Sequence, residues 1–72
     1  MNEFQLYSQV GRKIREVRES KHLNQQALAD LCNFEKSNMS RIEAGKTNLT
    51  IKTLGKIATS LGVKIKDLLD FE

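Results

Sequence analysis

Five polar residues that can hydrogen-bond to the edges of nucleic-acid bases lie between positions 36 and 41. They are Lys36, Ser37, Asn38, Ser40 and Arg41. Met39 and Ile42 would bury one side of a short helix here, which leaves residues 36, 37, 40 and 41 facing outward and Asn38 to the side. Arg and Lys donate to guanine O6 and N7, Asn pairs with adenine, and Ser is permissive. A solvated helix face has the same composition, so these residues alone leave both interpretations open.

The preceding segment predicts another short helix. Asn24 is a good N-cap for a helix over Gln25–Cys32, and Asn33 tolerates the left-handed conformation in which many helices end. The residues expected to face inward are Leu28, Leu31 and Cys32.

A tight turn should join the two helices. Phe34 is expected to plug this turn, after which the helix with the five polar residues runs from about Lys36 to Ala44 and ends at Gly45. Two helices arranged in this way over about residues 24–44 suit a protein that inserts one of them into a DNA groove.

Three further helices should hold this pair in place. The chain has no Pro, and its apolar residues recur three and four apart, which indicates an all-α domain. The first helix should run from about Phe4 to Lys21. Its apolar face would consist of Leu6, Val10, Ile14 and Val17. Gly11 within it costs about 1 kcal/mol of helix propensity, which suggests a close contact with another helix.

Thr50 is a suitable cap for a fourth helix over Ile51–Leu61, which Gly62 would end. Its inner positions would be Leu54, Ile57, Ala58 and Leu61. A short fifth helix over about Ile65–Leu69 closes the core with Leu68. Five helices in 72 residues leave only short connections, as in a compact orthogonal bundle.

Length and composition indicate one domain, over residues 1–72, that must fold on its own apolar core. One Cys and one His give neither an internal disulfide nor a zinc site, so we expect no metal and no other cofactor. No apolar run could cross a bilayer, and there is no export signal, so we expect a cytoplasmic protein. No constellation of catalytic residues is evident, and we do not expect an enzyme.

The net charge of +3 is weak support for a polyanionic partner. Asp67, Asp70 and Glu72 crowd the last six residues, so the preceding part of the chain is more basic than this total implies. We expect the acidic end to be solvated and turned away from DNA.

Four motifs run in one register through most of the chain. Two of them, Leu23-x-Gln25-x-x-Leu28-Ala29 and Ser40-Arg41-Ile42-Glu43-x-Gly45-Lys46, span the predicted helix pair. The others are Ile14-Arg15-x-x-Arg18 and Leu54-x-x-Ile57-Ala58-x-x-Leu61-Gly62-Val63. Together they cover about residues 10–69 and resemble the lambdoid phage Cro and repressor family of helix-turn-helix proteins, the XRE-like transcriptional regulators.

This resemblance implies a five-helix, lambda-repressor-like DNA-binding domain that binds double-stranded DNA. It assigns base recognition to the five polar residues from Lys36 to Arg41, most firmly to Ser37 and Arg41. Contacts to DNA phosphates are implied for Asn24, Gln25, Lys46, Thr47 and Asn48. Gln25 also lies at a helix N-terminus, where backbone N–H groups favour anions.

The resemblance also implies a partly buried ion pair between Arg18 and Glu43, which ties the first helix to the end of the recognition helix. Two positions depart from the family. Glu35 stands where a Ser or Thr often caps the recognition helix, and Lys64 where a Ser often precedes the last helix. The first departure puts the preferred DNA site in doubt, but not the fold.

One module of this size buries too little surface for tight DNA binding. We therefore expect a homodimer on a pseudo-palindromic operator, with half-sites ~34 Å apart. The apolar end of the chain is hard to bury in so small a monomer. It suggests a dimer interface made by Leu68, Leu69 and Phe71.

The expected function is sequence-specific transcriptional regulation, most simply repression. A restriction–modification controller and an antitoxin that represses its own operon are open alternatives, and no toxin or other protein partner can be identified. A more distant alternative is a protein-interaction module that has kept the fold and lost DNA binding.

Overall fold

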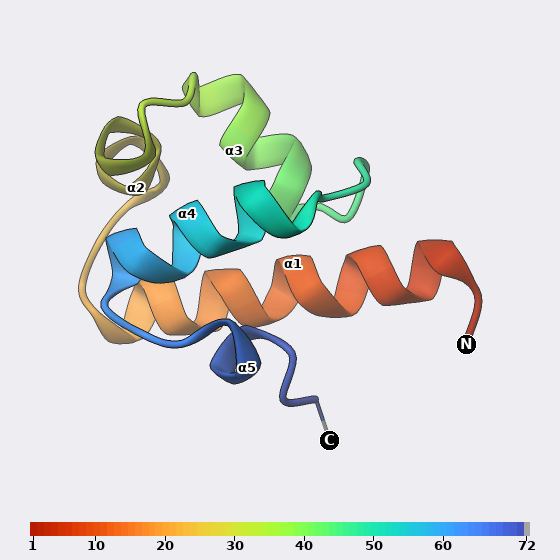
Figure 1. The fold of residues 1–72 in the computed structure, drawn as a ribbon. Helices are drawn as coiled ribbons and strands as arrows, with labels where there is room; N and C mark the ends of the chain where they lie inside the picture. Colours follow the sequence, from red (N-terminus) through yellow and green to blue (C-terminus); the bar gives the residue numbers. More distant parts are fainter. Residues whose placement is uncertain (72) are drawn as a thin grey trace.

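The computed structural model describes residues 1–71, and this part of the chain contains five helices. They are α1 (Glu3–Ser20), α2 (Gln25–Cys32), α3 (Lys36–Glu43), α4 (Ile51–Leu61) and α5 (Ile65–Leu68). The long α1 contacts α3, α4 and α5, and α2 packs between α3 and α4 (Figure 1). The predicted all-α class is confirmed. Within residues 1–71, no helix is long and apolar enough to span a membrane.

Side chains cap the N-terminal ends of α1, α2 and α4. Asn24 and Thr50 each accept a backbone N–H three residues further on, at 2.8 and 3.0 Å. Asn33 ends α2 with a φ of 58°, in the left-handed conformation expected of it. α1 begins one residue earlier than predicted because Asn2 and Gln5 form a reciprocal capping box. α1, α3 and α5 each end one residue before the predicted position.

The apolar core is drawn from all five helices. Its buried members are Val10, Ile14, Leu28, Ala29, Cys32, Met39, Ile42, Leu54, Ile57, Ala58, Leu61 and Leu68. The prediction for Leu31 was wrong, because its side chain is 58% exposed. α2 turns Leu28, Ala29 and Cys32 inward, and successive residues are rotated by about 100°, so Leu31 lies to the side of this buried arc.

α1 and α3 approach each other so closely that only glycine fits at position 11. A Cβ atom there would lie 2.5 Å from the carbonyl oxygen of Ile42 and 2.6 Å from that of Glu43. The predicted close helix contact at Gly11 is therefore confirmed, and its partner is the backbone at the end of α3. This contact fixes the distance between α3 and the long helix that supports it.

A buried ion pair joins the same two helices. The Arg18 guanidinium donates to the Glu43 carboxylate from Nε at 2.7 Å and from Nη2 at 3.0 Å, and Nη1 donates to the carbonyl of Leu23 at 2.7 Å. The two charged side chains are only 8% and 2% exposed. Hydrogen bonding to Glu43 raises the pKa of Arg18, which outweighs the opposing effect of burial. The pair with Glu43 therefore favours the charged form of Arg18.

Substituting Gly11→Ala should destabilise the domain, although Gly→Ala in a helix normally stabilises by about 1 kcal/mol. Overpacking against backbone carbonyls costs roughly 1–3 kcal/mol, which lowers the Tm of so small a domain by at least about 4 °C. Gly55→Ala in α4 is the matched control, because its Cβ would meet only Ile65 Cδ1 at 3.6 Å. Thermal unfolding followed by circular dichroism should show opposite shifts in the two variants. Equal upward shifts would contradict the close contact.

Glu43→Ala should cost about 3–5 kcal/mol of unfolding free energy, because it leaves the Arg18 guanidinium buried without a counter-charge. The control is Arg15→Ala, which breaks the 3.5 Å pair with Glu19 between side chains that are 62% and 58% exposed. We expect that change to cost less than about 1 kcal/mol. Urea titration measures both values, and similar losses in the two variants would refute the special role of the buried pair.

Candidate nucleic-acid interface

The outward face of α3 carries the five residues predicted to contact bases. The side chains of Lys36, Ser37, Asn38, Ser40 and Arg41 are all exposed. On the opposite side of the helix, Met39 and Ile42 are 0% and 2% exposed. α3 is thus divided into a buried apolar side and a polar side that is open to a ligand.

The N-terminal end of α3 is electrostatically unusual. Glu35 occupies the N-cap position, and its side chain makes no capping hydrogen bond. The backbone N–H of Asn38 donates to the carbonyl of Glu35 at 3.1 Å, which leaves the N–H groups of Lys36 and Ser37 to solvent or to a ligand. A carboxylate here repels phosphate and can accept a hydrogen bond from a cytosine amino group.

Gln25 begins α2 beside the buried ion pair. Its amide Nε2 donates to Glu43 Oε1 at 3.0 Å, and the residue is half-buried. A Gln amide has two N–H donors, so one remains for a further acceptor while the other is held by Glu43. Neighbouring Asn24 is exposed, but its side-chain oxygen is already used as the α2 cap. The link from Gln25 to Glu43 was not foreseen in the sequence, which gives no signal for a contact across 18 positions.

The loop after α3 begins at Gly45, whose backbone packs closely against α1. Gly45 has a φ of +74°, and a Cβ atom on it would lie 2.6 Å from Ser8 Cα, so both conformation and space call for glycine. The backbone N–H of Lys46 donates to the carbonyl of Arg41 at 3.0 Å, which closes the end of α3. Lys46 and Asn48 are exposed and Thr47 is half-buried, so this loop extends the polar surface of α3.

The C-terminal residues differ from the predicted dimer interface. Leu68 is 0% exposed in the protein's own core, where α5 packs on α1 and α4, so its side chain is not available to a partner. The argument that a monomer could not bury this end was therefore wrong for Leu68. Leu69 is 42% exposed and Phe71 is half-buried against the core. Of the predicted acidic end, Glu72 lies outside the described residues, whereas Asp67 and Asp70 are exposed.

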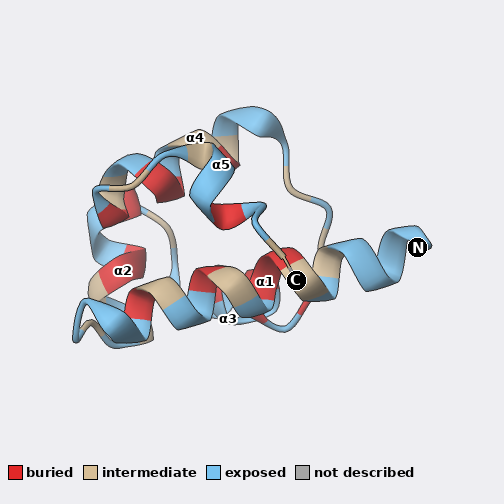
Figure 2. Ribbon diagram, turned by 90° about the horizontal axis from the view of Figure 1, so that it is seen from below, coloured by how far each residue is buried: buried red, intermediate tan, exposed pale blue. Residues whose placement is uncertain are grey.

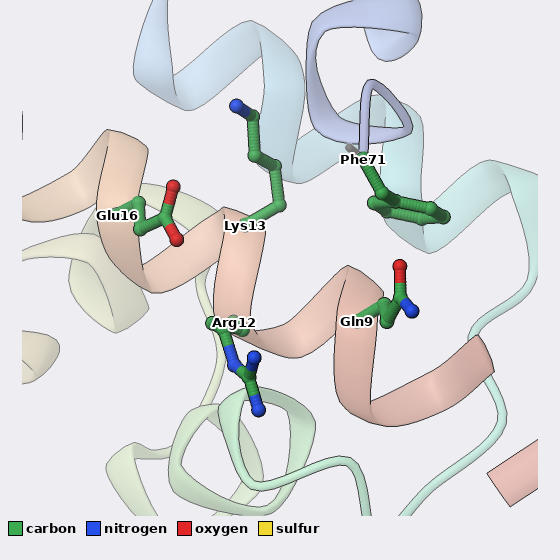
Figure 3. A pocket seen from close by; sticks show the side chains of 5 residues that line it. All are labelled: Gln9, Arg12, Lys13, Glu16 and Phe71. Carbon is green, nitrogen blue, oxygen red and sulfur yellow. The ribbon is translucent and has the colours of Figure 1, made fainter. Parts of the chain in front are cut away.

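A shallow pocket of about 320 Å³ lies between α1 and the C-terminal segment. Gln9, Arg12, Lys13, Glu16 and Phe71 line it (Figure 3). Arg12 and Lys13 point in opposite directions, and Glu16 adds a negative charge (Figure 3). The cations do not converge on a common point, so this pocket does not form a compact anion site.

Several proteins with similar sequences or structures are named as control proteins, repressors or transcriptional regulators. The chain is 42% identical over 62 residues to the control protein C.BamHI of Bacillus amyloliquefaciens, a match covering 85% of this chain and 76% of that protein. It is 30% identical to the immunity repressor of Bacillus phage phi105 over 88% of this chain and 44% of the repressor. The crystal structure of the restriction-modification controller C.AhdI from Aeromonas hydrophila superposes with a TM-score of 0.83 and 31% identity, covering 86% of this chain and 94% of C.AhdI.

The family assignment rests on most of the chain. Residues 14–68 match the helix-turn-helix family HTH_3, and this range contains α2, the turn, α3, α4, α5 and the last part of α1. The chain belongs to the HTH_3 family of helix-turn-helix transcriptional regulators.

Proposed function

We propose that the protein is a repressor that binds a pseudo-palindromic operator in double-stranded DNA as a homodimer, and that it has no enzymatic activity of its own. α3 lies in the major groove, and its five exposed polar residues contact base edges. The observation that carries this proposal is the continuous polar surface on the outward side of α3, backed by a buried apolar side. Such a regulator works where the operator DNA is, which we take to be the cytoplasm.

Phosphate contacts on both sides of α3 would fix its position in the groove. Gln25 reaches a phosphate from the start of α2 with the amide hydrogen that Glu43 leaves unused, and the backbone N–H groups there add to the attraction. Asn24 contributes beside it. Lys46, Thr47 and Asn48 contact the backbone from the loop after α3. These contacts set affinity and orientation, whereas base contacts determine sequence preference.

Control of a restriction–modification system is the specific biological role that we favour. C.AhdI is named as a restriction-modification controller and C.BamHI as a control protein, and the chain covers most of each of them. The similarity to a phage immunity repressor supports the broader role of repression. None of these three proteins is named as an antitoxin.

The assignment of bases and phosphates to different residues can be tested with two variants. Arg41→Ala should cost about 1–3 kcal/mol on the preferred site and relax the preference at one base position. Gln25→Ala should weaken binding to all sequences about equally. Selection of bound sequences from a random duplex library supplies the sites, and fluorescence anisotropy supplies the affinities. Equal effects of the two variants on every sequence would contradict this division of roles.

A salt series separates the regulator from a protein-interaction module that has kept the fold. Several phosphate contacts should make the logarithm of the binding constant fall with the logarithm of salt concentration with a slope of about −0.9 per contact. Lys46→Ala should reduce this slope by about one without altering sequence preference. Lys66→Ala, on the distant α5, removes the same charge and should leave the slope unchanged. Absence of salt-dependent binding to duplex DNA would favour the interaction module.

A further inference from the structure

An apolar groove lies at the end of the molecule where α1 begins. It has a volume of about 170 Å³ and is formed by α1, the α3–α4 loop, the start of α4 and the residue after α5. Its lining residues are Leu6, Tyr7, Val10, Asn48, Leu49, Ile51, Leu54 and Leu69. None of these described side chains carries a charge, although 29% of the sequence is charged.

Exposed apolar side chains gather at this same end. The described part of the chain has six large apolar residues with substantial exposure, and three of them line the groove: Ile51 at 73%, Leu6 at 42% and Leu69 at 42%. Phe4, at 69%, lies in the first turn of α1 and Met1, at 74%, precedes that helix, whose exposed N-terminal end projects beyond the rest of the fold (Figure 2). The sixth, Leu31, lies on α2. Contact with DNA phosphates would leave the three exposed side chains of the groove in water.

The chemistry of the groove fits another copy of the same chain. Two identical proteins of net charge +3 repel each other overall, and a two-fold contact uses the same face of both copies. An uncharged apolar face avoids this repulsion and gains from burial. Charges close to the groove have both signs: Glu3 accepts a hydrogen bond from Tyr7 at 3.1 Å, and Lys52 follows Ile51.

The position of the groove also suits the way in which the protein would bind an operator. Two groove residues, Asn48 and Leu49, belong to the loop that leads from the C-terminal end of α3 to α4 (Figure 1). A two-fold contact here would bring the two loops close together and leave both polar faces of α3 uncovered. A symmetric operator requires two recognition helices that are held at a fixed separation in this way.

We infer that two copies of the chain associate through this groove, with Leu6, Ile51 and Leu69 at the centre of the contact. The inference rests on the proposed homodimer and replaces the interface predicted from Leu68, Leu69 and Phe71. Of those three residues, only Leu69 lines the groove.

The test is the oligomeric state of an Ile51→Glu variant. Ile51 is the exposed first residue of α4, where a carboxylate is favourable to the helix, so the variant should remain folded. In the dimer the substitution would place two carboxylates in an apolar contact, which should raise the dimer dissociation constant about 100-fold or more. Sedimentation equilibrium over a range of protein concentrations measures that constant for the wild type and the variant.

Leu31→Glu is the matched control, because it changes charge equally at a large exposed side chain on α2. It should dimerise like the wild type. Thermal melting checks the fold of each variant, and Leu6→Glu replaces Ile51→Glu if the latter fails to fold. Equal weakening by Ile51→Glu and Leu31→Glu, or no weakening by either, would overturn the groove as the interface while leaving the homodimer intact.

DNA binding separates this inference from the proposed function. On a duplex with a single half-site, Ile51→Glu should bind as well as Leu31→Glu, whereas on a full operator it should bind more weakly. A wild-type monomer at concentrations that saturate the full operator would overturn both the groove interface and the homodimer. Loss of half-site binding by the folded Ile51→Glu variant alone would assign this face to DNA and overturn the inference.

Discussion

The arrangement of the helix-turn-helix depends on the Glu43 carboxylate. This one side chain, on the last residue of α3, accepts hydrogen bonds from Arg18 on α1 and from Gln25 at the start of α2. Three helices are thereby joined at one buried point. Because removing two charges from water is costly, a buried ion pair is weak support for stability. Here its effect is on geometry: it ties the residue expected to hold a phosphate to the helix expected to enter the groove.

The two ends of α3 differ in how closely they pack against the rest of the protein. At the C-terminal end, Gly11 lets the α1 backbone reach the carbonyls of Ile42 and Glu43, and Gly45 turns the chain directly against Ser8. At the N-terminal end, Glu35 offers no capping hydrogen bond, and the side chains that follow are exposed. One end of the helix is thus fixed to the core and the other is open to a ligand. In a domain with one cysteine and therefore no internal disulfide, this close packing replaces a covalent constraint.

Most of the fold could be predicted because its signals are local. Asn24, Asn33 and Thr50 mark helix ends through their own side chains or their tolerance of left-handed conformation, and apolar spacing identifies the buried faces. The failures have a common physical origin. Leu31 and Leu68 are similar in sequence, but their burial depends on which neighbouring helix covers them. α5 packs against both α1 and α4, which cover Leu68, whereas Leu31 lies to the side of the α2 face that packs on α3 and α4.

The candidate site could also be predicted in part from the sequence. The outward face of α3 follows from helical spacing, and family resemblance supplied the Arg18–Glu43 pair, which the structure confirms. The contact of Gln25 with Glu43 and the groove around Leu49 and Ile51 bring together residues that are distant in sequence, and no spacing rule marks them. The loop from Lys46 to Asn48 takes part in both surfaces, since it continues the polar face of α3 and also borders the apolar groove. Any contact that orders this loop from the apolar side therefore orders it for DNA as well, so that dimerisation and operator binding would each favour the other.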